Sequence, residues 1–332
     1  MDGNDGGLVT LSPAVSQFIG RPKQVLINGK WQAARSGKTF EVYNPANGEV
    51  IAHAAACEKA DVDLAVAAAR DAFDTGPWRR MTASERGRIV WKIGDLILKY
   101  AEELAQLESL DNGKPIAVAR AADVPLAADL FHYMAGWATK IEGNTIPLSV
   151  PYTPGAEYHA YTRKEPIGVV GIITPWNFPF LIVAQKLPFA LAAGCTTVVK
   201  PSELTSGSTL LLGEILMEAG VPGGVVNILV GTGPEIGSVM TSHPDVDMVS
   251  FTGSTGVGKL TMASAAQHLK KVSLELGGKN PQIVFPDANL DEFIDAAVFG
   301  AYFNAGECCN AGSRLILHKD IASDVVARVA EL

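Results

Sequence analysis

The sequence predicts an α/β protein built on a doubly wound parallel sheet. After Pro166, short apolar runs alternate with stretches of helical periodicity, which is typical of parallel strands joined by helices. A turn at Gly278-Lys279-Asn280-Pro281 ends this alternation, and a further strand, helix and strand follow it. We therefore expect two α/β units. The expected strands after Pro166 are Val169–Ile173, Thr196–Val199, Val225–Val230, Met248–Phe251 and Val272–Leu276, and the expected helices are Phe180–Ala193, Thr205–Ala219, Pro234–Ser242 and Gly256–Gln267.

Before Pro166 the pattern predicts an arm, a helical layer and a hairpin. Residues 1–25 carry no sustained period, so a flexible N-terminal arm is expected. Helical periodicity over roughly 60–140, with a capping box at Thr82-Ala83-Ser84-Glu85, predicts a layer of helices. A hairpin is expected at about 143–165, with strands at Thr145–Val150 and Tyr158–Arg163. Its exposed edges would suit pairing with another subunit.

The chain after the Gly278 turn predicts the start of a second unit. Its expected elements are a strand at Gln282–Phe285, a helix at Leu290–Asn304 and a strand at Arg314–His318. Ile321–Leu332 begins a further helix. The predicted domains are thus 26–278 and 279–332, after the arm of residues 1–25.

Composition narrows the classes of partner. The 332 residues are 48% hydrophobic and 19% charged, which is enough apolar content for a large core. With 35 acidic and 27 basic residues the formal net charge is −8, so neither nucleic acid nor a membrane surface is an expected partner. The start, Met1-Asp2-Gly3-Asn4-Asp5, has no basic segment, and a cytoplasmic location is expected. The four cysteines are expected to be reduced.

A thiol and a carboxylate stand on two separate glycine-rich turns. Cys308 and Cys309 lie in Gly306-Glu307-Cys308-Cys309-Asn310, and Glu275 lies in Leu274-Glu275-Leu276-Gly277-Gly278. A thiolate nucleophile and a carboxylate base can together form and hydrolyse an acyl-enzyme, and burial between the two leucines is expected to desolvate Glu275. The competing interpretations are a buried cysteine pair and a carboxylate that caps the next turn. A metal site is not expected, because no Cys-x-x-Cys spacing occurs and His318 is the only nearby histidine.

Three further motifs follow predicted strands. Gly253-Ser254-Thr255-Gly256-Val257-Gly258 opens a helix, where free N–H groups favour a phosphate. The motif differs from a P-loop at Leu260, which replaces the hydroxyl that would bind magnesium. The alternative interpretation is a strand-to-helix turn that needs glycine for its backbone conformation. Lys200-Pro201-Ser202-Glu203 places polar groups at a strand end, where doubly wound sheets bind ligands; as bare sequence it reads as a solvated loop. Asn177, within Trp176-Asn177-Phe178-Pro179, can donate to an oxyanion or serve a turn.

Taken together, these motifs closely resemble the NAD(P)-dependent aldehyde dehydrogenase superfamily, from about Leu26 to the last residue. The resemblance rests on Thr174–Pro179, Phe251–Gly256, Leu274–Lys279 and Gly306–Asn310, in family order. It implies that Cys309 is the nucleophile, that Asn177 holds the oxyanion, and that Glu275 is the base for water. Lys186 matches a family lysine proposed to relay protons, whereas its position alone suggests a surface helix lysine.

The resemblance also implies a Rossmann-like cofactor domain, part of a catalytic domain, and a hairpin that serves oligomerisation. Lys200 and Glu203 would bind the adenosine ribose hydroxyls, and Ser254 would touch the pyrophosphate. Because the Glu203 carboxylate would repel a 2′-phosphate, NAD is expected rather than NADP. The residues expected to bind the cofactor are Ile173, Thr174, Pro175, Trp176, Lys200, Ser202, Glu203, Gly233, Phe251, Thr252, Gly253, Ser254, Gly256, Val257, Gly258, Glu275, Leu276 and Gly277.

The function that the resemblance implies is oxidation of an aldehyde to its carboxylic acid, with reduction of NAD. A CoA-acylating relative is the alternative enzyme, although Glu275 argues against it, and an inactive nucleotide-binding remnant is the alternative from another class. Full-length family members are longer, so the chain is expected to be a fragment or the product of a truncated gene, with little activity as residues 1–332. A homodimer or homotetramer is expected of the full-length protein.

Overall fold

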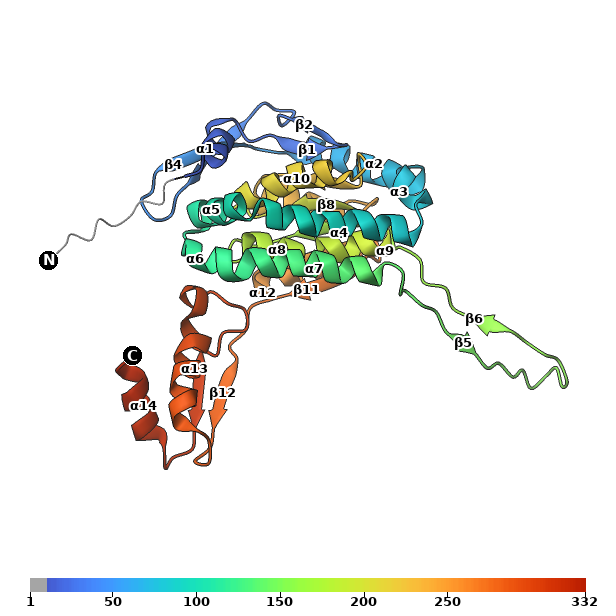
Figure 1. The fold of residues 1–332 in the computed structure, drawn as a ribbon. Coiled ribbons are helices and arrows are strands. Elements are labelled where there is room, and N and C mark those ends of the chain that lie inside the picture. Colours follow the sequence, from blue (N-terminus) through green and yellow to red (C-terminus); the bar gives the residue numbers. More distant parts are fainter. Residues whose placement is uncertain (1–10) are drawn as a thin grey trace. The chain divides into compact units, whose positions relative to one another are not determined.

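The computed structural model describes residues 11–332, and these divide into two compact units (Figure 1). The first unit runs to Phe251 and also includes Thr261–Ser273. The second consists of Thr252–Leu260 and Leu274–Leu332. These units are defined by contacts within the chain. The expected boundary at Gly278, between domains 26–278 and 279–332, stays a prediction. Within residues 11–332, no helix is both long and apolar enough to cross a membrane.

A seven-stranded sheet has the order β11-β10-β7-β8-β9-β1-β2. Neighbours among β10, β7, β8 and β9 pair in parallel, and β1 joins β9 in the antiparallel sense. Every residue of β7 and β8 is buried, as expected for parallel strands covered on both faces. The strands are β1 (Val25–Ile27), β2 (Lys30–Gln32), β7 (Val169–Ile173), β8 (Thr196–Lys200), β9 (Val226–Ile228), β10 (Met248–Thr252) and β11 (Lys271–Glu275).

The strand order confirms the doubly wound arrangement. β8 and β9 extend the sheet on one side of β7, while β10 and β11 extend it on the other. The switch point therefore lies between β7 and β10, and sheets of this kind bind ligands at the carboxyl ends of the strands beside that point. The helices between the strands are α8 (Pro179–Ala184), α9 (Leu187–Ala193), α10 (Gly207–Ala219), the π-helical turn η2 (Gly233–Gly237), α11 (Ser238–Ser242) and α12 (Thr255–Ala266).

The expected helical layer over residues 60–140 is confirmed. The Thr82 hydroxyl accepts the Glu85 N–H at 3.2 Å, and the Glu85 carboxylate accepts the Thr82 N–H at 2.7 Å, so the capping box forms. α4 and α7 pack along each other (Figure 1). The helices are α2 (Lys59–Asp74), α3 (Pro77–Arg80), α4 (Ala83–Lys99), α5 (Ala101–Asn112), α6 (Ile116–Val118), the π-helical turn η1 (Ala119–Asp123) and α7 (Val124–Trp137).

The N-terminal part of the described chain is more ordered than expected. The interpretation of residues 1–25 as an arm is wrong for Pro13–Gly20, which form helix α1; residues 1–10 lie outside the described residues. The Ser12 hydroxyl accepts the Val15 N–H at 3.2 Å, proline occupies the first turn, and Val15 and Phe18 are buried. Strands β3 (Thr39–Tyr43) and β4 (Val50–Ala55) also form an antiparallel pair that the sequence did not predict.

The predicted hairpin forms with shorter strands. β5 (Thr145–Ile146) and β6 (Ala160–Tyr161) pair in the antiparallel sense. Tyr152 and Tyr161 are 85% and 69% exposed. The hairpin therefore presents large side chains to solvent on this chain.

The second unit contains the predicted strand, helix and strand. β12 and β13 pair in parallel, and α13 connects them. A 3₁₀ turn, η3, follows α13 and leads to the two cysteines. The elements are β12 (Pro281–Val284), α13 (Leu290–Tyr302), η3 (Phe303–Gly306), β13 (Arg314–Leu317) and α14 (Ala322–Ala330).

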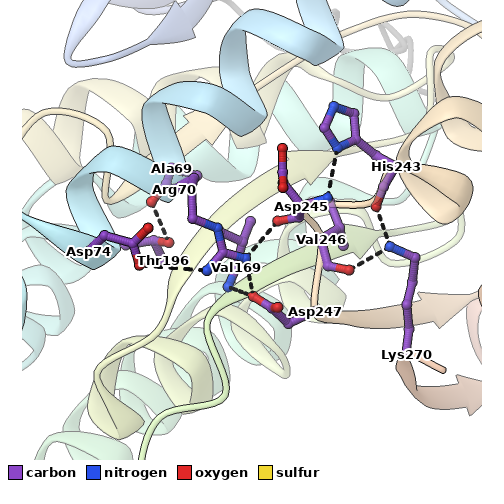
Figure 2. Close-up of polar contacts among 10 residues, drawn as sticks. All are labelled: Ala69, Arg70, Asp74, Val169, Thr196, His243, Asp245, Val246, Asp247 and Lys270. Carbon is purple, nitrogen blue, oxygen red and sulfur yellow. Dashed lines mark hydrogen bonds and ion pairs between the residues drawn. The ribbon is translucent and has the colours of Figure 1, made fainter. Parts of the chain in front are cut away.

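Asp247 joins three segments at the amino ends of β7 and β10 (Figure 2). Its carboxylate accepts the Val169 N–H at 2.7 Å and forms an ion pair with Arg70 of α2. Arg70 also donates to the backbone carbonyl of Asp245 at 2.9 Å. These bonds hold α2 against the end of the sheet that lies opposite the carboxyl ends of the strands.

Replacing Asp247 by alanine is expected to lower the free energy of unfolding by about 1–3 kcal/mol, because the Val169 N–H would lose its acceptor and Arg70 would lose one of its acceptors. Urea unfolding followed by circular dichroism measures the change. Asp245→Ala is the matched control, since Arg70 bonds only the backbone carbonyl of Asp245. Equal losses in the two variants would contradict the assigned role of the Asp247 carboxylate.

Candidate active site

The cysteine pair follows a segment of left-handed backbone. Asn304, Ala305 and Gly306 have φ angles of +52°, +56° and +77°. A residue with a Cβ loses about 1–2 kcal/mol in this conformation, so Asn304 and Ala305 are strained positions. Strain of this kind is concentrated at functional sites, where it directs a particular side chain. The segment thus supports a functional interpretation of the cysteines that follow it.

The two cysteines have different surroundings. Cys308 is half-buried, and its thiol donates to the Phe303 carbonyl at 3.4 Å. Cys309 is exposed. Reactive cysteines need access to solvent and substrate, whereas packed cysteines are inert. The exposure of Cys309 is consistent with its expected role as nucleophile, and the alternative of a buried cysteine pair is not found.

The turn after Glu275 packs directly on the backbone of Cys309. A Cβ on Gly278 would lie 2.8 Å from the Cys309 carbonyl oxygen, which is closer than a side chain can come. Asn280 Nδ2 donates to the same oxygen at 3.2 Å. Glycine at 278 is thus required by a close approach of two backbones. This contact brings the Glu275 turn and the cysteine loop together within the second unit.

Glu275 lies at the carboxyl end of β11 and is exposed on this chain. The desolvation expected from its two leucine neighbours is not found, because Leu274 and Leu276 are themselves only half-buried. Its backbone carbonyl accepts the Gly253 N–H at 3.0 Å, so the end of β11 is bonded to the loop after β10. Leu276 packs closely on Gly258, where a Cβ would lie 2.6 Å from Leu276 Cδ2.

Asn177 and Lys186 belong to the first unit. Asn177 is half-buried in the segment between β7 and α8. Lys186 is only 9% exposed, and its Nζ donates to the Ser250 hydroxyl of β10 at 3.0 Å. The interpretation of Lys186 as a surface lysine is therefore wrong. The expected helix Phe180–Ala193 is interrupted there, and the lysine lies between α8 and α9 with its ammonium turned toward the sheet.

Lys200 and Glu203 form an ion pair at the carboxyl end of β8. Lys200 is 3% exposed, and its Nζ donates to Glu203 Oε2 at 3.1 Å and to the Pro201 carbonyl at 3.0 Å. Burial lowers the pKa of Lys200, and Glu203 opposes that shift. Ser202 is buried beneath the pair. The arrangement is a structured strand end and not the solvated loop that bare sequence suggested.

The ends of β7 and β10 carry hydroxyls that no described protein group satisfies. The Oγ1 atoms of Thr174 and Thr252 are buried, and neither has a hydrogen-bond partner among the described residues. Buried hydroxyls without partners are costly, so such atoms at the end of a switch-point strand fit a polar ligand. A Cβ on Gly233 or on Gly256 would meet no atom within 4 Å. The strand ends thus combine open backbone with unsatisfied polar groups.

Helix α12 begins with the glycine-rich motif. The Ser254 hydroxyl accepts the Val257 N–H at 3.3 Å, as an N-cap residue does. The other N–H groups at the start of a helix have no intrahelical acceptor, and together with the helix dipole they favour an anion. The N-cap contact gives Ser254 a local role that its sequence motif did not reveal.

The expected catalytic residues fall into two sets. Cys309 and Glu275 share the second unit, while Asn177 and Lys186 share the first. Sequence reasoning missed Ser250, which receives the Lys186 ammonium, and Asn280, which bonds the Cys309 carbonyl. A hydroxyl within an apolar strand was the available signal for Ser250. Asn280 had been interpreted only as part of a turn.

Comparisons with known proteins agree on one family. Residues 31–332 match the family model described as "Aldehyde dehydrogenase family". The chain is 51% identical over 309 residues to aldehyde dehydrogenase family 2 member C4 of Arabidopsis thaliana, which covers 93% of this chain and 61% of that protein. It is 48% identical over 310 residues to human retinal dehydrogenase 2, covering 93% of this chain and 59% of that protein. The chain thus spans about three fifths of the length of these curated relatives.

A solved structure supports the same family. The chain resembles the NAD⁺ complex of aldehyde dehydrogenase from Bacillus cereus with a TM-score of 0.94 and 46% sequence identity. The match covers 98% of this chain and 65% of that one. Similarity at this level extends over both units.

Proposed function

Because the chain belongs to the aldehyde dehydrogenase family, we propose that the protein oxidises an aldehyde to the carboxylic acid with NAD as hydride acceptor. The observation that carries the proposal is the exposed Cys309 thiol, on a strained loop whose backbone contacts the turn after Glu275. A nucleophile and a base on adjacent turns suit acyl transfer to water. This arrangement favours hydrolytic release of the acid.

The residues at the strand ends fit NAD. Glu203 would accept bonds from the adenosine ribose hydroxyls beside Lys200, and the start of α12 would hold the pyrophosphate. The unsatisfied Thr174 hydroxyl at the end of β7 supports a polar ligand there. When bound, NAD supplies the hydride acceptor that the protein itself lacks. We propose that all the cofactor-binding residues expected from the sequence contact NAD.

The side chains of this chain would do the remaining chemistry. The Cys309 thiolate adds to the carbonyl carbon, and the Asn177 amide donates to the resulting oxyanion. After oxidation, the acyl group is a thioester on Cys309. Glu275 takes a proton from water, whose oxygen attacks the thioester carbonyl. The C–S bond breaks, the acid and the Cys309 thiolate are released, and protonated Glu275 returns its proton to solvent. Lys186, bonded to Ser250, is proposed to assist proton movement from within the first unit.

An assay with the purified full-length protein tests the proposal. The protein is incubated with NAD and a panel of aliphatic and aromatic aldehydes, and NADH and carboxylic acid are both quantified. Equal amounts of NADH and acid are expected. Acid without NADH, acyl-CoA formed only when CoA is added, or no product from any aldehyde would contradict it. The oligomeric state, the pairing role of the β5–β6 hairpin and the cytoplasmic location stay predictions.

Glu203 is expected to make the protein prefer NAD over NADP. Bonds from a carboxylate to two hydroxyls are charge-assisted, so their loss in Glu203→Ser is expected to lower kcat/KM for NAD by about 10–100-fold. The kcat/KM for NADP is expected to change much less, so the ratio of kcat/KM for NAD to that for NADP is expected to fall. Glu214→Ser, on α10 and paired with Arg21, is the control for a lost surface carboxylate. A wild-type preference for NADP would contradict the assignment.

A further inference from the structure

A buried charge cluster lies in the helical layer of the first unit. Glu108 and Lys114 are completely buried, and Asp123 is 2% exposed. Lys114 forms an ion pair with Asp123 and lies 3.6 Å from Glu108. Burial of a charged group is costly unless it is paired, so the cluster needs a compensating role beyond packing.

The cluster contacts the segment that carries Asn177. Lys114 Nζ lies 4.1 Å from the centroid of the Phe178 ring, within the range of a cation–π interaction. Two residues earlier, Asn112 Nδ2 donates to the Trp176 carbonyl at 2.8 Å. The residues on both sides of Asn177 are therefore bound by the same short piece of chain. Asn177 itself lies between these two attachment points.

The attachment is built by the end of α5. Gly113 ends this helix in the left-handed conformation, with φ +82°, and so lets Asn112 and Lys114 reach the segment together. Asp111 accepts the Gly207 N–H at 2.8 Å, which fixes the end of α5 to the start of α10. The polar residues around Gly113, which are Asp111, Asn112 and Lys114, thus contact different parts of the first unit.

Burial also raises the pKa of the two neighbouring carboxyls. The pKa of Glu108 rises to about 7, opposed by Lys114, and the pKa of Asp111 lies well above its usual range. The ion pair of Lys114 with Asp123 and the contact of Lys114 with the Phe178 ring are both given by geometry.

We propose that Asn112 and Lys114 are positioning residues, which hold the Trp176 carbonyl and the Phe178 ring on either side of Asn177 and so direct its side-chain amide at the oxyanion. This inference rests on the proposed function. A displacement of about 1 Å in a catalytic group can cost on the order of 10²-fold in rate. Loosening either attachment is expected to lower kcat, while the KM for NAD changes little.

The variants are Asn112→Ala and the double variant Lys114→Met with Asp123→Asn. The second substitution in the pair avoids leaving the buried Asp123 carboxylate without its counter-charge, which could unfold the protein. Lys23→Met is the matched control, because Lys23 is also buried and its Nζ lies 3.9 Å from the Phe18 ring, in the segment between α1 and β1. Each test variant is expected to lose about tenfold to a hundredfold in kcat. The control is expected to keep the wild-type kcat.

A double-mutant cycle separates positioning from general damage. If Asn112 and Lys114 act through Asn177, their substitutions are expected to change kcat by no more than about twofold in an Asn177→Ala background. A full effect in that background would overturn the proposal. So would an equal loss of kcat in the Lys23→Met control.

Hydrogen exchange tests the attachment without activity. A peptide covering residues 174–182 is expected to exchange faster in both test variants than in the wild type or in Lys23→Met. Unchanged exchange would overturn the positioning role even if the wild type is an active dehydrogenase. Conversely, faster exchange in a protein that oxidises no aldehyde would leave the attachment established and would reject the function on which the oxyanion role depends.

Discussion

Replacing Cys309 by alanine is expected to abolish aldehyde oxidation, with a loss on the order of 10³-fold or more in kcat. The proposed acyl-enzyme needs a sulfur nucleophile, and Cys309 is the exposed thiol of the pair. The side chain makes no packing contact that alanine would remove from the core, so the melting temperature is expected to stay near that of the wild type. The loss is measured as NADH formation at saturating aldehyde and NAD.

Cys308→Ala is the matched control for that result. The Cys308 thiol donates to the Phe303 carbonyl and is half-buried, so its loss is expected to reduce stability by about 1 kcal/mol and to keep most of the activity. Alkylation with iodoacetamide followed by mass spectrometry reports which sulfur reacts. Label on Cys308 with Cys309 unmodified would overturn the assignment of the nucleophile.

Glu275→Gln is expected to slow steady-state turnover by about 10²–10⁴-fold while a first turnover survives. The amide cannot take a proton from water, but the thioester on Cys309 can still form. Rapid mixing of protein, NAD and aldehyde is expected to give a burst of NADH near one equivalent, followed by a nearly flat trace. Glutamine keeps the shape of the exposed side chain, so the fold is expected to be unchanged.

The size of the burst distinguishes two roles for Glu275. Loss of the burst together with turnover would show that Glu275 acts before acylation, for example in forming the Cys309 thiolate. An intact steady state would exclude it as the base for water. Asp287→Asn, on the turn after β12, is a control for removal of an exposed carboxylate from the same unit.

Much of the fold could be predicted because its signals are local. The apolar run Val169–Ile173 is the strand β7 to the residue, and the alternation that follows specifies the doubly wound order. The capping box at Thr82 marked the start of α4 correctly. By contrast, β1 and β2 have three residues each, and such short runs show no period that distinguishes a strand from a loop. Helix α1 has eight residues but buries only Val15 and Phe18, so its apolar period is too short to identify it.

In the candidate site, too, the features that could be predicted are local in the sequence. Glycine at 277 and 278, the adjacent cysteines and the polar strand ends are motifs in consecutive residues, so the sequence alone identified Cys309, Glu275 and Asn177 as the residues of interest. Which of the two adjacent thiols is exposed follows from the backbone of the loop, whose left-handed residues Asn304 and Ala305 have no signal in the sequence.

What the sequence by itself determined is therefore the order of elements and the position of the motifs, since both depend on neighbouring residues. Only the tertiary structure decided that Lys186 is buried against Ser250 and that Glu275 is exposed. It alone placed Lys114 against Phe178, 64 residues later in the chain (178 − 114). The physical reason is that the burial of a charged side chain depends on groups distant in sequence, which supply its counter-charge and displace its water.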